Sequence, residues 1–142
     1  MGLNIEDLRE QAESGSHVAQ CLLGVCYLDG TDVAVDYKQA FRLLSEAASN
    51  GVSRAILSLA RMHAEGLGIT QNVAEATRLY KSVAKVEFLA AIELGRIYSS
   101  GVAVGADRNQ ARQWYLLATE YENRVGDCEE IREAKAYLAT EN

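Results

Sequence analysis

AQCLLGVCYLDG, at residues 19–30, is the stretch that decides the fold, because its pattern returns twice further along the chain. The later copies read AILSLARMHAEG at 55–66 and AAIELGRIYSSG at 90–101. Each copy has an alanine, a leucine four residues later, a small residue next to that leucine, and a closing glycine. Apolar residues three and four apart share one face of a helix, and glycine readily forms the left-handed stop at a helix end. The pattern therefore predicts three amphipathic helices, each ended by its glycine.

The same steps of 36 and then 35 residues relate positions outside these helices. They connect Leu23 with Leu59 and Leu94, Val33 with Ile69 and Val104, Asp36 with Asn72 and Asp107, and Ala40 with Ala76 and Ala111. Self-similarity at such a period indicates stacked supersecondary units, each of which buries its apolar face against its neighbours. The shorter step falls near Lys85, at a turn between two units, where a deletion is tolerated.

A second helix begins in each unit with the signature of a capping box. The pairs are Asp36 with Gln39, Asn72 with Glu75, and Asp107 with Gln110. In such a box the first side chain accepts from exposed backbone N–H groups and the second reaches back to the first residue. We expect helices at 16–29 and 37–49, 52–65 and 73–85, and 87–100 and 108–122. Helices at 5–14 and 128–140 should cap the two ends, with Ile131, Ala134, Tyr137 and Leu138 facing inward.

Composition and charge limit the class of protein. The chain has 142 residues, 49% of them hydrophobic, and no proline, which suits one domain of continuous helices. No apolar run approaches the ~18 residues of a membrane span. The net charge of −6 argues against a nucleic-acid ligand. The first residues are acidic and mixed, unlike a signal peptide, so we expect a cytoplasmic protein unless a signal peptide has been removed. The cysteines, Cys21, Cys26 and Cys128, are odd in number, and we expect them to be free thiols in a reducing compartment.

The chain resembles the Sel1-like repeat family, relatives of the tetratricopeptide repeat. The third unit carries the resemblance most fully, with Leu94-Gly95, Tyr98, Gly101, Val104, Asp107, Ala111 and Trp114-Tyr115. The middle unit departs from the family pattern with Ala60 for glycine and His63 for tyrosine. The resemblance implies an all-α fold, a right-handed α-solenoid of three helix-turn-helix repeats at about 16–51, 52–86 and 87–122. Capping helices at 4–15 and 127–140 complete a single domain over 1–142. The family implies partner binding and no catalytic residues.

Few residues suggest catalysis, a cofactor or a metal site. His63 stands in the column of Tyr27 and Tyr98, so we interpret it as a packed aromatic substitute and not as a general base. His17 and Cys21 have the spacing of two metal ligands on one helix, but a buried, hydrophobe-like cysteine is the preferred interpretation. Gly66-Leu67-Gly68 lacks the further residues of a phosphate loop and is interpreted as a turn. We expect no enzyme activity, no cofactor and no metal.

A partner should bind the concave face, which the first helix of each repeat usually lines. By analogy with the tetratricopeptide repeat, the expected positions are Val18, Cys21, Val25, Asp29, Arg54, Leu57, Arg61, Glu65, Leu89, Ile92, Arg96 and Ser100. Arg54 and Arg61 are seven residues apart and share a helix face, and Arg96 stands beside Arg61 in the next unit. A short arginine stripe flanked by Val18, Val25 and Leu89 could therefore receive an acidic or carboxylate-terminated segment. The alternative is that Arg61 only pairs with Glu65 on the surface of its own helix.

The leading functional hypothesis is a protein- or peptide-binding adaptor or scaffold. The alternative is an immunity or regulatory protein that binds and blocks one specific enzyme, and an enzyme is the third and weakest hypothesis. The expected partner is another protein or a peptide, with no nucleic acid and no membrane. Association of copies through the ends of the stack, as a homo-oligomer, is a further hypothesis.

Overall fold

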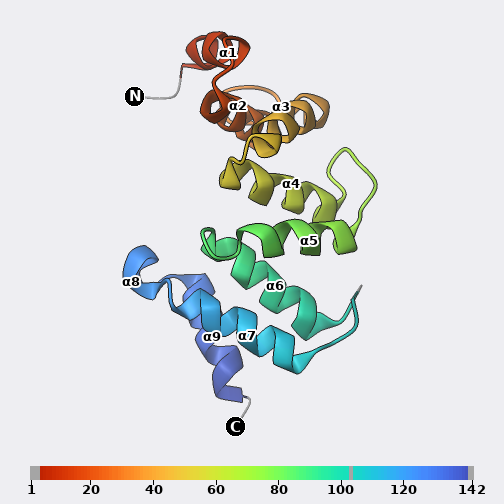
Figure 1. The fold of residues 1–142 in the computed structure, drawn as a ribbon, viewed down its shortest axis with the longest axis vertical. Coiled ribbons are helices and arrows are strands. Elements are labelled where there is room, and N and C mark those ends of the chain that lie inside the picture. Colours follow the sequence, from red (N-terminus) through yellow and green to blue (C-terminus); the bar gives the residue numbers. More distant parts are fainter. Residues whose placement is uncertain (1–3, 103, 141–142) are drawn as a thin grey trace. The chain divides into compact units, whose positions relative to one another are not determined.

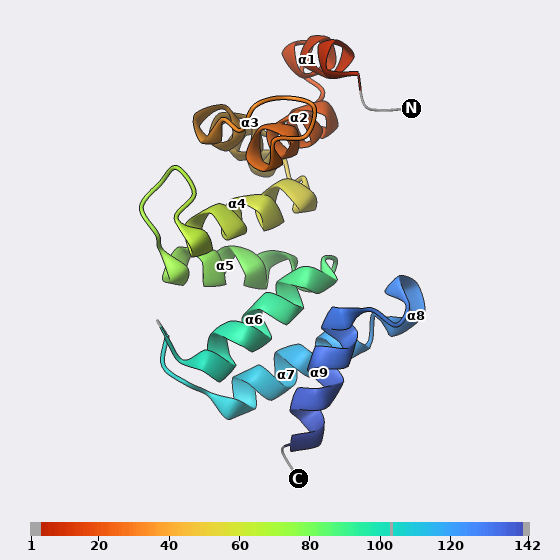
Figure 2. The same ribbon diagram turned by 180° about the vertical axis from the view of Figure 1, so that it is seen from behind.

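The computed structural model describes residues 4–102 and 104–140, and within them every regular element is an α-helix. The helices of this part of the chain are α1 Ile5–Glu13, α2 His17–Asp29, α3 Tyr37–Ser49, α4 Ser53–Glu65, α5 Val73–Val83, α6 Phe88–Ser100, α7 Arg108–Thr119, α8 Glu122–Val125 and α9 Glu129–Thr140. Figures 1 and 2 show them as a succession of helical hairpins. The expected all-α fold is confirmed.

Contacts group the helices into two compact units, one up to Asn72 and one from Val73. In the first unit, α2 packs against α1, α3 and α4, and α3 also contacts α4. In the second unit, α6 packs against α5, α7 and α9, and α9 also contacts α7. The expectation of a single domain over 1–142 stays a prediction.

The loop between the two helices of a repeat has the same construction three times. Gly30, Gly66 and Gly101 take the left-handed conformation, with φ of 73°, 69° and 67°. Each glycine N–H donates to the carbonyl four residues earlier. At the far end of the loop, the N–H groups of Asp36, Asn72 and Asp107 donate to the carbonyls of Tyr27, His63 and Tyr98, at 2.9, 2.8 and 3.0 Å. These shared bonds fix where each second helix begins.

Of the two hydrogen bonds expected in each capping box, the one accepted by the first side chain is confirmed at Asp36 and Asp107. The Asp36 carboxylate accepts from the Gln39 N–H at 3.1 Å, and Asp107 does the same for Gln110 at 3.0 Å. The second expected bond, from the Asp36 N–H to the Gln39 side chain, is not formed, because the Asp36 N–H donates to the Tyr27 carbonyl. The Gln39 side chain instead accepts from Arg42.

The leucine of each repeat is buried, and the small residue beside it lets the two helices of a hairpin approach. Leu23, Leu59 and Leu94 are 4%, 8% and 0% exposed. A Cβ on Gly95 would lie 2.7 Å from the Tyr115 ring. In the first unit, Leu23 joins a core with Leu8 and Leu43, against which Val33 packs from the loop.

Two predicted helix ends are wrong. The helix expected at 108–122 ends at Thr119, and the short helix α8 follows it. The reason is Tyr121, which turns inward, is buried, and donates its O–H to the Ala84 carbonyl at 3.1 Å. The helix expected to end at 85 ends at Val83, so residues 84–86 form the turn to α6.

The C-terminal helix α9 packs as predicted. Ile131 and Ala134 are buried, while Tyr137 and Leu138 are half-buried. No helix in the described part of the chain is long and apolar enough to cross a membrane.

Candidate functional site

The first helix of each repeat leaves one narrow stripe open. On α2 the stripe consists of Val18, Leu22, Val25 and Asp29, spaced four, three and four residues apart, which keeps them on one helix face. Val18 is 64% and Leu22 40% exposed, Asp29 is exposed, and Val25 is half-buried.

The same columns are open in the other two repeats. On α4 the stripe is Arg54, Ser58, Arg61 and Glu65, and on α6 it is Leu89, Glu93, Arg96 and Ser100. All eight side chains are exposed or half-buried. We call these three sets of four residues the open stripes.

One set of equivalent positions that was expected to be exposed is buried. Cys21, Leu57 and Ile92 were expected to face a partner, but they are 3%, 8% and 0% exposed. The open stripes contain Leu22, Ser58 and Glu93 instead, one residue further along the chain. The cause is that α2 and α6 each contact three other helices, which leaves only a strip of each helix open. Position 22 follows position 18 by four residues, and this helical spacing is the signal that the sequence reasoning missed.

In the first unit, an arginine joins the stripes of α2 and α4. The Arg61 Nη1 lies 3.0 Å from the Asp29 Oδ1, and its Nε donates to the Glu65 Oε2 at 3.1 Å. Because Asp29 and Arg61 belong to different stripes, their ion pair shows that the two stripes lie on the same side of this unit. Arg54, also exposed, forms no ion pair within the residues that the structure describes.

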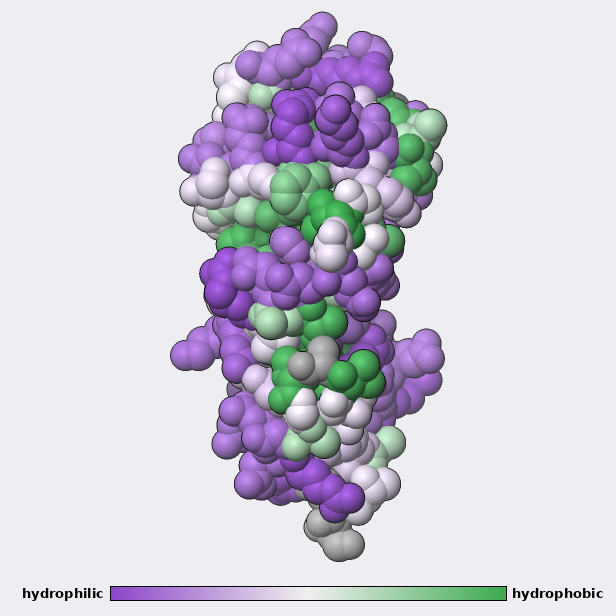
Figure 3. Space-filling view, turned by 90° about the vertical axis from the view of Figure 1, so that its right-hand side faces the viewer, coloured by the Kyte–Doolittle hydropathy of each residue, from purple (hydrophilic) through white to green (hydrophobic). Residues whose placement is uncertain are grey.

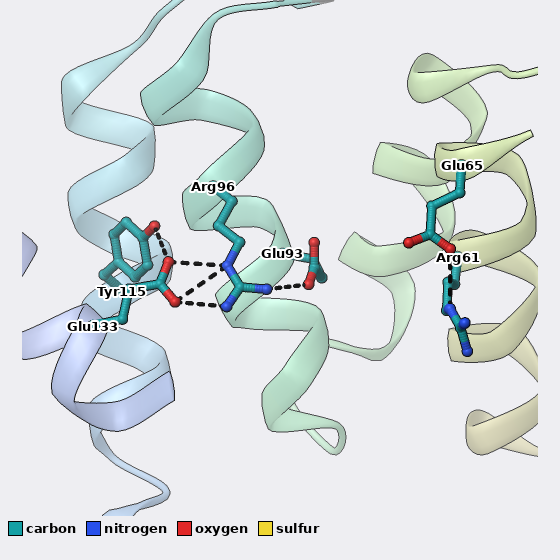
Figure 4. Close-up of polar contacts among 6 residues, drawn as sticks. All are labelled: Arg61, Glu65, Glu93, Arg96, Tyr115 and Glu133. Carbon is teal, nitrogen blue, oxygen red and sulfur yellow. Dashed lines mark hydrogen bonds and ion pairs between the residues drawn. The ribbon is translucent and has the colours of Figure 1, made fainter. Parts of the chain in front are cut away.

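In the second unit, Arg96 joins the stripe of α6 to α9. Figure 4 shows its guanidinium against Glu133, with Nε 2.9 Å from Oε1 and Nη2 2.6 Å from Oε2, while Nη1 donates to Glu93 at 2.6 Å. The Tyr115 O–H also donates to Glu133, at 3.2 Å. Hydrogen bonds from Arg96 lower the pKa of Glu133, and burial raises the pKa of Tyr115 to about 12.

Two of the three arginines of the expected stripe, Arg61 and Arg96, are thus occupied, while Arg54 forms no ion pair with a described residue. The surface pair of Arg61 with Glu65, proposed as the alternative, is present. Arg61 also holds Asp29, and Arg96 holds Glu93 and Glu133. Since Arg61 and Arg96 belong to different compact units, a continuous arginine stripe stays a prediction.

The histidines and cysteines have packing partners. His63 meets the Phe41 ring edge-on, with centroids 6.3 Å apart, as an aromatic substitute should. The His17 Nδ1 lies 3.0 Å from the Gln20 Oε1, and Cys21 is buried. Across residues 4–102 and 104–140, no three His, Cys, Asp or Glu side chains gather as they would around a metal ion. None of the three cysteines forms a disulfide bond with a described residue. The arrangement offers surfaces for binding.

Apolar side chains are also exposed outside the open stripes. The face drawn in Figure 3 is largely polar, with separate apolar patches. Large apolar side chains that are well exposed include Val35 and Val102 in loops, Leu116 on α7, Val86 in the α5–α6 turn and Val125 on α8.

Comparison with known proteins gives one family. A family model described as the Sel1 repeat matches residues 17–52, 53–85 and 89–120. The crystal structure of a Sel1 repeat protein from Oxalobacter formigenes is similar with a TM-score of 0.73 and 32% identity, covering 96% of this chain and 97% of that chain. A protective antigen of uropathogenic Escherichia coli, c5321, gives a TM-score of 0.77 and 29% identity, covering 99% of this chain and 34% of that one.

Two curated relatives match in sequence. An exopolysaccharide production negative regulator from Rhizobium leguminosarum bv. viciae is 29% identical over 125 residues, which are 78% of this chain and 47% of the regulator. The DAP3-binding cell death enhancer 1 of Mus musculus is 35% identical over 77 residues, 54% of this chain and 15% of that protein. The chain spans about half the length of the regulator and a smaller part of the enhancer.

Proposed function

Because the chain belongs to the Sel1 repeat family, whose fold generally serves protein interaction and not catalysis, we propose that it is an adaptor or scaffold module that binds a protein or peptide along its open stripes. The observation that carries the proposal is the recurrence of these stripes in one register on α2, α4 and α6. Packing inside the repeat does not determine residues that face solvent, so their chemistry is available for recognition.

The stripe of α2 is the part best suited to anchor a partner. Val18 and Leu22 expose more than a third of their surface on adjacent turns of one helix. Burying apolar surface of this kind against a partner is the main source of binding free energy. On α4, the exposed guanidinium of Arg54 and the hydroxyl of Ser58 add polar groups that can select among apolar segments.

An acidic partner segment is the finer part of the proposal. Arginine pairs with carboxylates through two parallel hydrogen bonds, which supports this choice. Such a segment would have to exchange with Asp29 and Glu65 at Arg61, and with Glu93 and Glu133 at Arg96. We expect Arg61→Glu and Arg96→Glu to weaken partner binding, and unchanged affinity would remove the acidic preference while leaving the binding surface in place.

Site-specific photo-cross-linking in the source cells tests the surface. A photo-reactive phenylalanine analogue replaces Leu22 in one variant and Lys38, an exposed residue on the second helix α3, in the matched control. We expect a discrete cross-linked protein from position 22 and none from position 38. Equal products from both positions, or a product from position 38 alone, would contradict binding along the first helices.

A second candidate function has one observation in its favour. The rhizobial relative is named a negative regulator, which agrees with a regulatory protein that binds and blocks one specific enzyme. Identification of the proteins cross-linked at position 22 separates the two candidates. A single catalytic partner whose activity falls on binding favours the regulator, and several non-catalytic components favour the adaptor.

We also propose a cytoplasmic location, supported by three cysteines that form no disulfide bond with a described residue. Fractionation of the source cells with an antibody against the chain checks this point.

A further inference from the structure

The second unit contains a depression outside the open stripes. It has a volume of about 390 Å³ and is lined by Lys85, Leu117, Glu120, Tyr121 and Arg124. Lys85 comes from the α5–α6 turn, Leu117 from α7, and Arg124 from α8. Leu117 and Tyr121 are the lining residues with large apolar side chains. A space of this size accepts one or two side chains of a peptide, and it is at the small end of the range for whole ligands, ~300–1,000 Å³.

Tyr121 holds the depression in shape before any ligand arrives. Its ring is 7% exposed and lies 6.2 Å from the Phe88 ring, and its O–H donates to the Ala84 carbonyl at 3.1 Å. That hydrogen bond fixes the residue before Lys85. The Arg124 guanidinium lies over the same ring, 5.6 Å from its centroid. One buried tyrosine therefore contacts Arg124 and fixes the backbone next to Lys85, which lowers the cost of ordering the Arg124 side chain on binding.

Exposed apolar side chains stand next to the lining residues in the chain. Val86 is 60% exposed, Leu116 42% and Val125 37%, and they adjoin Lys85, Leu117 and Arg124 respectively. Single exposed apolar residues are ordinary on a surface, and these three do not line the depression itself.

The cations of the depression, like Arg54 but unlike Arg61 and Arg96 of the open stripes, have no carboxylate partner among the described residues. Neither Lys85 nor Arg124 forms an ion pair with any described residue, whereas Arg96 binds two carboxylates. Glu120 is the one carboxylate of the lining, so two cations face one anion there. Burial is the main cause that raises the pKa of Tyr121; Arg124 opposes this shift, and Glu87 and Glu120 add to it.

We propose that this depression is a second partner-binding surface, distinct from the open stripes, and that it takes a peptide segment with a large apolar side chain beside a carboxylate. The apolar side chain rests on Leu117 and Tyr121, and the carboxylate lies between Lys85 and Arg124. Peptides are commonly anchored by a buried apolar side chain next to a charge-assisted hydrogen bond, here between the carboxylate and the two cations. An anionic bilayer fits less well, because it needs a cluster of cations without an intervening carboxylate.

Selection from a random phage-displayed peptide library on the full chain tests the surface. We expect enriched peptides to share an apolar residue next to Asp or Glu. The strongest one, labelled for fluorescence anisotropy, should bind the Lys85→Glu/Arg124→Glu variant about tenfold or more weakly, because both charge contacts become repulsive. Arg108→Glu/Arg112→Glu is the matched control, since both arginines are exposed on α7 and form no ion pair with described residues. Its affinity should stay near that of the wild type.

Several outcomes would overturn the proposal. One is the absence of an enriched peptide, and another is equal binding by the amide analogue with Asn and Gln in place of the acids. Equal losses of affinity in the two charge variants would show that the net charge of the protein, and not the depression, governs peptide binding. Loss of binding in Val18→Asp/Leu22→Asp would place the peptide on the open stripes and so support the proposed function instead. Self-association of the wild type in sedimentation velocity that the Lys85→Glu/Arg124→Glu variant abolishes would also contradict the proposal. So would binding to phosphatidylserine vesicles that this variant loses. Circular dichroism of each variant shows that the fold is kept.

Discussion

At the scale of single residues, the glycines beside the repeat leucines decide how closely two helices approach. Gly24 lies against Leu44, and Gly95 against Tyr115, at distances that leave no room for a Cβ. The sequence predicted this role from the recurring small residue alone. The sequence could not predict the ion-pair partner of each arginine, because Arg61 pairs with Asp29 and Arg96 with Glu133, which are 32 and 37 residues away in the sequence.

Replacing Gly95 by alanine tests the close approach. Alanine gains about 1 kcal/mol over glycine in a helix interior, so an open site would be stabilised. Here the new Cβ would lie 2.7–2.8 Å from three atoms of the Tyr115 ring. Overpacking costs about 1–3 kcal/mol, so we expect a net decrease in the free energy of unfolding, measured with urea. A variant more stable than the wild type would contradict the packing described.

The Glu133 carboxylate gives a pH dependence of known sign. Its pKa lies below the ordinary value of 4.5 because Arg96 donates hydrogen bonds to it, which outweighs the opposing effect of burial. A group with a lowered folded pKa adds stability above its unfolded pKa and loses it as the pH falls through the folded value. Glu133→Gln should therefore be less stable than the wild type at neutral pH, and the difference should shrink below pH 4.5.

Urea unfolding at a series of pH values checks this expectation. Glu129→Gln is the control, because Glu129 is exposed on the same helix and forms no ion pair with a described residue. The control should follow the wild type. A Glu133→Gln deficit that persists unchanged into acid would show that the side chain acts through packing and not through its charge.

At the scale of elements, the helices were predictable because several local signals agree. Glycine stops, side-chain caps and apolar spacing recur in register, and every helix limit from the start of α2 to the start of α7 lies within two residues of expectation. The failures have physical causes outside local sequence. The last helix of the third repeat stops early because Tyr121 reaches back to Ala84, a contact between residues 37 apart. The column of Cys21 is buried by neighbouring helices that spacing alone does not reveal.

The cap of α3 is a prediction at this scale. Asp36→Ala removes the acceptor of the Gln39 N–H and should lower the free energy of unfolding by ~1 kcal/mol. Asp36→Asn keeps an oxygen acceptor and should cost less. Thermal or urea unfolding of the two variants measures the difference, and equal effects from Ala and Asn would contradict a role for the side-chain hydrogen bond.

At the scale of the whole molecule, the repeat is the source of the proposed binding surface. Packing fixes the alanine, leucine and glycine columns, and it leaves the open stripes and the depression beside α8 to vary. Association of copies through α1 and α9, the first and last helices, stays a prediction that sedimentation velocity can test. The sequence located most of the open stripes, yet neither composition nor periodicity pointed to the depression, because Tyr121 and Lys85 meet only in the folded unit.

The most direct measurement of the central claim is the affinity of the cross-linked partner for stripe variants. Val18→Asp/Leu22→Asp places charge on the apolar stripe of α2, and Val102→Asp, at a loop residue that is 87% exposed, adds the same kind of charge elsewhere. Isothermal titration calorimetry should show at least about tenfold weaker binding for the stripe variant, a loss of ~1.4 kcal/mol, and wild-type affinity for Val102→Asp. Unchanged affinity of a folded Val18→Asp/Leu22→Asp variant would contradict binding along the first helices.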